Sequence, residues 1–221
     1  MSNTNEIQAC IFDLDGVIVD TANFHYKAWK RLANELGFDL TPEQNEKMKG
    51  ISRMESLDML LEIGNIEADR KEKKKLADLK NGWYRDYISE MQPNDLLPGV
   101  IDLMEELTEE HILIAIGSAS KNAPTIVRQV QIGRYLDALI DGSKVTKGKP
   151  HPEVFLKAAE EMGVEPAHCV VFEDAQAGID AARNGGMRTI GVGSQQVLQH
   201  ADMIIPGLSE INLEKIRTLE K

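Results

Sequence analysis

The chain has 221 residues, 42% of them hydrophobic, and a formal net charge of −11. This length is enough for one sizeable core, or for a core with a small accessory domain. The negative charge repels phosphate backbones and anionic lipids, so we expect no nucleic-acid partner and no membrane partner.

Neither a membrane span nor an export signal is visible in the sequence. No apolar run reaches the ~18 residues that a bilayer requires, and the opening residues MSNTNEIQ lack the basic and then apolar layout of a signal peptide. We therefore expect a cytoplasmic protein. Cys10 and Cys169 each lie in a short apolar segment with no second cysteine nearby, so we expect two buried free thiols.

The first predicted element is a strand, ACIFD, that ends in carboxylates. Asp13 and Asp15 stand two residues apart, and Gly16 lets the chain turn away sharply. Such a pair can share a divalent cation, or divide the work of nucleophile and proton carrier. A calcium loop is the alternative, but Val17 stands where that loop needs an oxygen ligand, and Gly16 comes too early.

The next region, from about Asn23 to Met91, has helical periodicity and charge-rich faces but no convincing strand. It is too long for one crossover connection, so we predict a helical accessory domain inserted after the first strand. Its lysine-rich segment at 69–80 is interpreted as a solvated helix face, with a binding patch as the alternative.

Pro93 and Pro98 disfavour continued helix beyond this region. We therefore assign residues 22–92 to the helical domain and residues 1–21 and 93–221 to the core.

In the remaining chain, short strand-like runs alternate with amphipathic segments. The strand-like runs lie at 112–118, 138–142, 169–174 and 189–193, and the helical segments at 99–110, 122–132, 151–163 and 176–185. Unbroken Ile, Val and Phe runs suit strands that are covered on both faces. The alternation predicts an α/β fold with a doubly wound, mostly parallel, Rossmann-like core. Ligands of such sheets bind beyond the carboxyl ends of the strands.

A possible phosphate cradle follows the second strand-like run. Its residues are Ser118, Ala119, Ser120, Lys121 and Asn122. A hydroxyl and free backbone amides leading into a helix bind phosphate well, although serine before a helix is also an ordinary N-cap.

Two further polar groups follow the later strands. Lys149 precedes Pro150, and a nucleotide-binding P-loop is excluded because Pro150 replaces the Ser/Thr and the spacing from Gly142 is one residue too long. Glu173 and Asp174 follow the buried run CVVF, where helix capping explains one acid better than two.

Together, these four groups fall at four successive strand ends that face one crevice. Carboxylate oxygens suit Mg²⁺, while the hydroxyl and the lysine bind phosphoryl oxygens. The sequence therefore predicts a Mg²⁺ site and a dianionic phosphate substrate.

At this point the chain resembles the haloacid dehalogenase superfamily of phosphotransferases over essentially its full length. The segments DLDGV, GSASKN, KGKPHPE and FEDAQAGIDAA stand in the order of that superfamily's four motifs. FDLDGVIVDT, FHYKAW, KGISR and SASKN further resemble its sugar phosphomutases. The resemblance implies a Mg²⁺-dependent isomerase that interconverts β-D-glucose 1-phosphate and glucose 6-phosphate through an aspartyl phosphate and β-glucose 1,6-bisphosphate. The helical insertion then corresponds to a cap domain.

The resemblance also implies roles for individual core residues. Asp13 becomes the nucleophile and Asp15 the general acid and base. The implied metal ligands are Asp13, the main-chain carbonyl of Asp15, Glu173 and Asp174. The implied ligands of the transferring phosphoryl group are Ser118, Ala119 and Lys149.

The remaining implied residues bind the far end of the substrate or move the cap. Those for the distal phosphate are Arg53, Ser120, Lys121 and Asn122. Lys49 and Gly50 are implied to lie in a specificity loop for the sugar, with Trp29 beside it. His25 and Lys80 are implied to help place Asp15 when the cap closes. Thr21 lies at the hinge.

Other interpretations stay open at this stage. Arg53 as a surface ion-pair partner, His25 as an exposed helix residue and Trp29 as a packing residue are the alternatives for the cap. A sugar-phosphate phosphatase with the same core, and a Mg²⁺- and sugar-phosphate-binding protein without catalysis, are the alternatives for the whole chain. Asp15 and Gly16 suit phosphate chemistry and argue against a dehalogenase. We expect a monomer whose partner is a small sugar phosphate.

Overall fold

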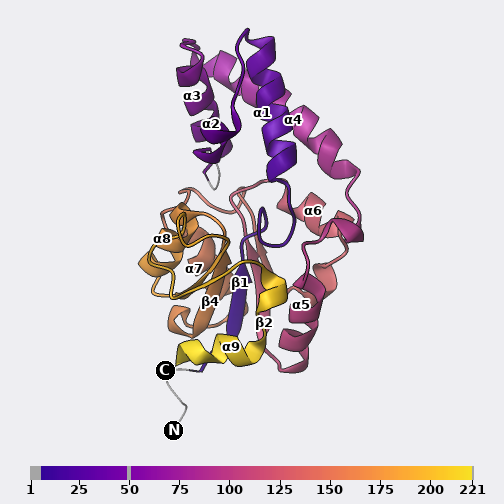
Figure 1. Cartoon of the computed structure of the whole chain (residues 1–221), viewed down its shortest axis with the longest axis vertical. Coiled ribbons are helices and arrows are strands. Elements are labelled where there is room, and N and C mark those ends of the chain that lie inside the picture. Colours follow the sequence, from indigo (N-terminus) through magenta and orange to yellow (C-terminus); the bar gives the residue numbers. More distant parts are fainter. Residues whose placement is uncertain (1–5, 49–50, 221) are drawn as a thin grey trace.

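The structure is a computed structural model that describes residues 6–48 and 51–220 (Figure 1). Its core is a six-stranded parallel sheet in the order β3-β2-β1-β4-β5-β6. The strands are β1 (Ala9–Phe12), β2 (Leu113–Gly117), β3 (Ala138–Ile140), β4 (Cys169–Glu173), β5 (Arg188–Val192) and β6 (Met203–Ile205). The parallel sheet predicted from the sequence is confirmed.

Alternate residues of the central strands face opposite sides of the sheet. In β1, Cys10 and Phe12 belong to one apolar cluster, whereas Ala9 and Ile11 belong to the other. The rings of Phe12 and Phe172 stack across the β1–β4 pair, with centroids 4.5 Å apart. These strands lack polar alternation because both of their faces are buried.

Helices cover both faces of the sheet (Figure 1). On one side are α5 (Val100–Glu109), α6 (Ala123–Gln129) and α9 (Leu213–Arg217), and on the other are α7 (Glu153–Met162) and α8 (Gln176–Asn184). The doubly wound arrangement is thus confirmed. α7 ends at Gly163, the last residue of the predicted segment 151–163, which adopts a left-handed conformation with φ 70°.

The strand β6 was not predicted from the sequence. This strand has three residues, lies at the sheet edge beside β5, and is half-buried at Met203 and Ile204. A run this short carries too little periodicity to distinguish it from a loop.

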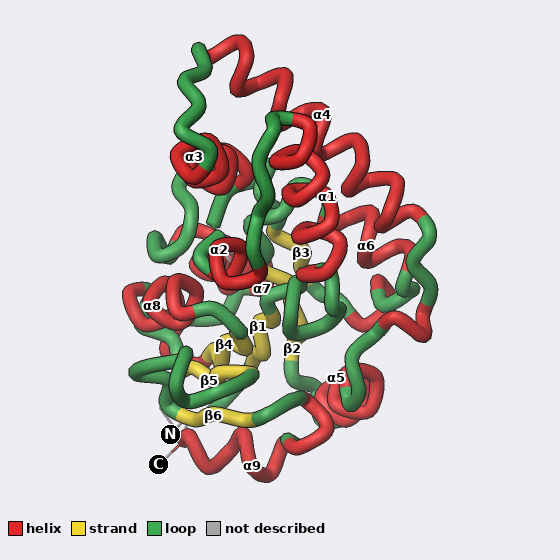
Figure 2. Tube along the Cα trace, turned by 45° about the horizontal axis from the view of Figure 1, so that its top comes forward, coloured by secondary structure: helices red, strands yellow, loops and turns green. Residues whose placement is uncertain are grey.

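Four further helices stand together above the carboxyl edge of the sheet (Figures 1 and 2). They are α1 (Ala22–Glu35), α2 (Pro42–Glu46), α3 (Arg53–Ile63) and α4 (Arg70–Ser89). Capping boxes at Thr41, Ser52 and Asp69 begin α2, α3 and α4. The inserted helical cap is confirmed, whereas its borders at residues 22 and 92 stay a prediction.

The cap helices pack around an apolar cluster of their own. Its buried members include Trp29, Leu32, Leu40, Leu57 and Leu60. This cluster is separate from the two clusters that line the sheet. The insertion therefore carries a small core of its own.

The two connections between the core and the cap lie side by side. Val19, which precedes α1, forms a bridge with Leu96, which follows α4. The amide of Leu97 also donates to the carbonyl of Ile18 at 2.9 Å. The cap is thus attached through one paired segment of backbone.

Two sequence-based expectations bear on the environment of the chain. No helix within residues 6–48 and 51–220 is long and apolar enough to cross a bilayer. Cys10 and Cys169 are both buried and free, as expected.

Replacing Leu60 tests the packing of the cap. Leu60 is fully buried in α3, so Leu60→Ala should lower the free energy of unfolding by about 2–5 kcal/mol. Leu79 lies in α4 and is 43% exposed, so the matched Leu79→Ala should change it by less than about 0.5 kcal/mol. Urea unfolding followed by tryptophan fluorescence measures both, and equal losses would contradict a packed cap core.

Candidate active site

Two neighbouring strands bring the first carboxylates together. Asp13 follows β1 directly, and Glu173 is the last residue of β4. The pairing of Phe12 with Phe172 continues into a hydrogen bond from the Asp13 amide to the Phe172 carbonyl, 2.9 Å long. Asp13 is 6% exposed and Glu173 is fully buried.

Lys149 lies between these two acids. Its Nζ is 2.5 Å from Asp13 Oδ1 and 2.8 Å from Glu173 Oε2. Burial opposes the charged form of Lys149, but the charges of Asp13 and Glu173 outweigh it and raise the pKa of the lysine well above its usual value. Lys149 is therefore a fixed positive charge at the bottom of the site.

Glu153 fixes the loop that carries Lys149. Its Oε2 accepts hydrogen bonds from the Thr146 amide at 3.0 Å and from the Lys147 amide at 2.8 Å. These bonds, the Lys147 amide first, lower the pKa of Glu153 to about 2. Glu153 thus places a carboxylate at the start of α7 and ties the preceding loop to that helix.

Three carboxylates converge on a potential cation site. One oxygen each of Asp13, Glu173 and Asp174 lies within 4.8 Å of the others. Burial, followed by the charge of Asp13, raises the pKa of Glu173 to about 8, despite the presence of Lys149. One lysine does not balance three carboxylates, and hard oxygen donors are those that Mg²⁺ prefers. The donor set fits Mg²⁺.

Two glycines allow the acids to approach the backbone this closely. A Cβ at Gly16 would lie 2.1 Å from Asp174 Oδ2, and one at Gly178 would lie 2.0 Å from the carboxyl carbon of Glu173. Both glycines belong to the quoted motifs DLDGV and FEDAQAGIDAA. The glycines of these motifs therefore serve the carboxylate site directly.

Asp15 differs from Asp13 in its surroundings. The Thr21 hydroxyl donates a hydrogen bond to Asp15 Oδ1, and the Asp15 amide donates to Asp13 Oδ2 at 3.0 Å. Burial and then the charge of Asp13 raise the pKa of Asp15 to about 6. A carboxyl group with this pKa can exchange a proton near neutral pH, which suits a proton carrier.

A cavity of about 480 Å³ lies between the sheet edge and the cap. Its wall includes many of the residues proposed from the sequence: Asp13, Asp15, Ala119, Ser120, Lys121, Asn122, Lys149 and Asp174 from the core, and His25, Trp29, Arg53 and Lys80 from the cap. Ser118, Thr21 and Glu173 lie buried behind the wall, where Ser118 Oγ accepts from the Ser120 amide at 3.1 Å. Lys49 and Gly50 lie outside the described residues.

Lys80 is a buried cation on the cap side of the cavity. It is 2% exposed, and its Nζ lies 2.8 Å from His25 Nδ1 and 4.4 Å from the centre of the Trp29 ring. Burial, followed by repulsion from Arg53, lowers the pKa of Lys80 to about 7, and burial also depresses the pKa of His25. Trp29 serves both the cap core and the cavity wall.

Sequence reasoning missed several amide and hydroxyl groups on the wall, including Asn45, Ser56 and Asn81. Asn122, proposed as a phosphate ligand, donates from Nδ2 to Asn81 Oδ1 at 2.9 Å and so links α6 to the cap. No sequence spacing identifies such residues. Asn81 could have been suspected, because it is adjacent to the proposed site residue Lys80.

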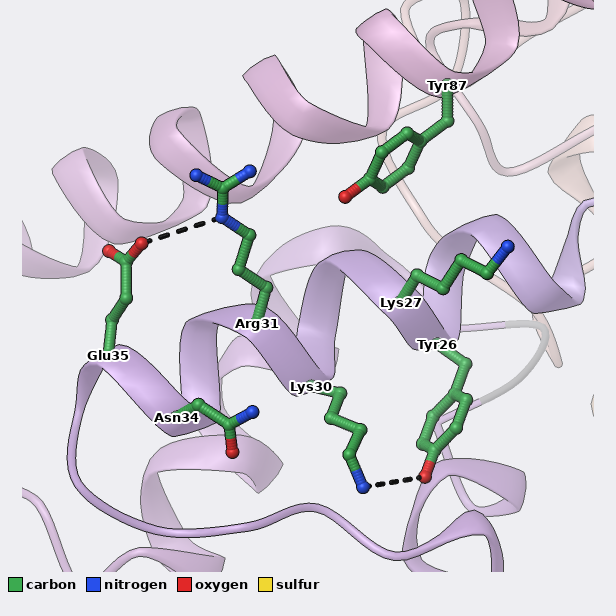
Figure 3. Close-up of a pocket in the computed structure, with 7 residues that line it drawn as sticks. All are labelled: Tyr26, Lys27, Lys30, Arg31, Asn34, Glu35 and Tyr87. Atoms are coloured by element: carbon green, nitrogen blue, oxygen red, sulfur yellow. Dashed lines mark hydrogen bonds and ion pairs between the residues drawn. The ribbon is translucent and has the colours of Figure 1, made fainter.

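A second hollow, of about 520 Å³, lies on α1 and is shown in Figure 3. Apart from Tyr87 of α4, all residues drawn there belong to α1. Two of its cations have carboxylate partners, since Arg31 pairs with Glu35 at 3.6 Å and Lys30 with Asp39 at 3.0 Å. The acidic cluster of Asp13, Glu173 and Asp174 lies elsewhere, so the cavity over the sheet edge is the candidate active site.

A parallel sheet that presents a carboxylate, a lysine and an acid pair at its strand ends, beneath a helical cap, defines a phosphoryl-transfer enzyme. The chain belongs to the haloacid dehalogenase-like hydrolase family, whose model matches residues 10–192.

Individual relatives are similar over nearly the whole chain. The chain is 43% identical to beta-phosphoglucomutase of Bacillus subtilis, over 94% of this chain and 93% of that protein. It is 29% identical to a phosphorylated carbohydrates phosphatase of Thermotoga maritima, over 83% and 84%. Its fold matches the crystal structure of beta-phosphoglucomutase from Clostridium difficile with a TM-score of 0.93 and 42% identity, over 97% of both chains.

Lys80 should make stability depend on pH. Its pKa is about 7 in the folded protein against 10.5 for the free group, so unfolding takes up a proton between these values and the free energy of unfolding rises with pH. Lys80→Met removes this dependence. Relative to the variant, the wild type should gain roughly 2–3 kcal/mol between about pH 6 and about pH 9.

Urea unfolding at both pH values measures this gain. Lys75→Met, at an exposed position of the same helix, is the control and should track the wild type at both. A difference between Lys80→Met and wild type that does not change with pH would contradict the assignment.

Proposed function

We propose that the protein is a Mg²⁺-dependent phosphomutase that interconverts β-D-glucose 1-phosphate and glucose 6-phosphate. The observation that carries this is one cavity lined by cations from both the core and the cap, which could hold two phosphate groups. Asp13 and Lys149 line it from the core, and Arg53 lines it from the cap. A bisphosphate intermediate needs both, and the similarity to two beta-phosphoglucomutases supports the choice of sugar.

Asp13 is the proposed nucleophile. Its carboxylate oxygen bonds to phosphorus as the bond from phosphorus to the sugar oxygen breaks, and Asp15 gives that oxygen a proton. In the second half of the reaction, Asp15 takes a proton from the other sugar hydroxyl as that oxygen attacks the aspartyl phosphate. Lys149 neutralises charge on the phosphoryl oxygens throughout.

The proposed magnesium ligands are Asp13, Glu173, Asp174 and the main-chain carbonyl of Asp15. A bound Mg²⁺ supplies further neutralisation of the phosphoryl charge. Ser118 and Ala119 are proposed to hold the same phosphoryl group, because the backbone amides between a strand end and a helix are open to anions.

The cap is proposed to separate sugar from water. Arg53, with Ser120, Lys121 and Asn122, holds the second phosphate, so closure is favoured only when a substrate carries one. His25 and Lys80 then lie over Asp15, and Thr21 acts as the hinge. The predicted specificity loop at Lys49 and Gly50 completes the assignment.

A sugar-phosphate phosphatase is the second candidate, favoured by the similarity to the phosphatase of Thermotoga maritima. It would use the same core and pass the aspartyl phosphate to water. A binding protein without catalysis is the third, and the intact group of Asp13, Asp15, Lys149 and Asp174 argues against it. Action as a monomer in the cytoplasm is proposed from the sequence.

The decisive experiment supplies β-glucose 1-phosphate, Mg²⁺ and a trace of glucose 1,6-bisphosphate. We expect glucose 6-phosphate with little free phosphate, and no product after the metal is removed with EDTA. Asp13→Asn should abolish turnover, since an amide does not attack phosphorus. Phosphate release at the rate of sugar turnover would favour the phosphatase, and turnover by Asp13→Asn would exclude Asp13 as nucleophile.

Arg53→Ala tests the second phosphate site. Loss of a charge-assisted contact to a phosphate should lower kcat/KM of the mutase reaction roughly 10- to 100-fold. Hydrolysis of acetyl phosphate, which has no second phosphate, should change little. Arg85→Ala, at an exposed position of α4, is the matched control. Equal losses in both reactions would show that Arg53 does not bind the distal phosphate.

A further inference from the structure

Asn45 is a buried amide on the cavity wall that none of the motifs explains. It lies near the end of α2, is 7% exposed, and lines the cavity over the sheet edge. Its backbone is satisfied, because its amide donates to Thr41 and its carbonyl accepts from Met48. Its side chain, by contrast, has no hydrogen-bond partner among residues 6–48 and 51–220.

Two other polar side chains on the cavity wall have protein partners. The Ser56 hydroxyl donates to the Met48 carbonyl at 3.3 Å, and the Asn122 amide donates to Asn81. Within the described chain, the Tyr84 hydroxyl is the side-chain polar atom that is fully enclosed without a partner. The Asn45 amide therefore keeps its accessible surface toward the cavity.

A polar group on a cavity wall that has no protein partner is hydrogen-bonded only by what the cavity contains. Such groups are rare in native proteins and require a reason. At Asn45 the missing partner has to come from the contents of the cavity.

The chemistry of the amide identifies that partner. An asparagine side chain is neutral, with two N–H donors and one acceptor oxygen, and so matches a hydroxyl group, which both donates and accepts. The cavity already offers Arg53 and Lys149 for phosphate groups. Met48 and Trp29 also line the cavity and supply apolar surface for a sugar ring.

We propose that the Asn45 amide hydrogen-bonds a ring hydroxyl of the sugar phosphate and so determines which sugars are accepted. This inference rests on the proposed function, since it assigns the sugar contact of the same site. A site built to bind a hydroxyl rejects the analogue that lacks it, because its own polar group is then left unpaired.

The test compares wild type and Asn45→Ala on four substrates: β-glucose 1-phosphate and its 2-deoxy, 3-deoxy and 4-deoxy analogues. Asn45→Ala should lower kcat/KM for the parent sugar about 10- to 100-fold. The analogue that lacks the partner hydroxyl should be slow with wild type and should lose nothing further in the variant. Equal losses on all four substrates, or no loss on any, would overturn the proposal.

Asn45→Leu provides a second variant of similar volume that also lacks hydrogen-bonding groups. Because it replaces an unpaired amide with apolar atoms, its melting temperature should equal or exceed that of wild type, while its kinetic pattern matches Asn45→Ala. Asn34→Ala, an exposed asparagine of α1 in the same cap, should leave all four rates unchanged. Normal hydrolysis of acetyl phosphate by the Asn45 variants shows that Asp13 chemistry is intact.

The outcomes separate this inference from the proposed function. If the wild type releases phosphate from these sugars, it is a phosphatase. The Asn45 assignment is then tested by comparing the hydrolysis rates of wild type and Asn45→Ala on the same four substrates. An active wild type with equal losses in the variant overturns only the Asn45 assignment. A wild type inactive on every sugar phosphate overturns both.

Discussion

The Lys149 ammonium, held between Asp13 and Glu173, is the interaction on which the rest of the site depends. A buried charge is stable only beside partners of opposite charge. Here the lysine allows the two acids to be buried, and the acids allow the lysine to be buried. Asp174 leaves the group with excess negative charge. A bound cation would offset the excess carboxylate charge, and the phosphate of a ligand would be attracted by the ammonium of Lys149.

The cap carries the complementary charge. Arg53 and Lys80 face a cavity whose floor holds Asp13 and Asp15, and burial disfavours the charged form of both cap cations. Bringing these cations over the core therefore costs free energy that a dianionic ligand offsets. Burial is the main cause of the depressed pKa of Lys80. In the proposed function, this cost makes closure of the cap depend on bound substrate.

The positions of residues that follow strands could be predicted, because the carboxyl ends of parallel strands lie at one edge of the sheet. This holds however far apart the strands are in the sequence. That rule located Asp13, Lys149 and Glu173 before any coordinates. Asn45 was not predictable, since its burial depends on how α2 packs over the cavity. The lysine-rich run at 69–80 is solvated over most of its length, as predicted, but Lys80 at its end turns inward, and only the family resemblance indicated that.

The core alone does not choose between mutase and phosphatase chemistry. In the proposed mechanism, an aspartyl phosphate at Asp13 accepts attack by water or by a sugar hydroxyl, and Asp15 is the base for either. The choice therefore depends on whether water or sugar fills the cavity when the phosphate is formed, which is decided by the cap. In the proposed reaction, Arg53 binds the second phosphate and Asn45 binds a sugar hydroxyl. The hydroxyl of Thr21, the residue before α1, donates to Asp15. Substrate selection is thus assigned to the cap and phosphoryl transfer to the core, which pack around separate apolar clusters. The hydrogen bond from Thr21 to Asp15 connects the two units.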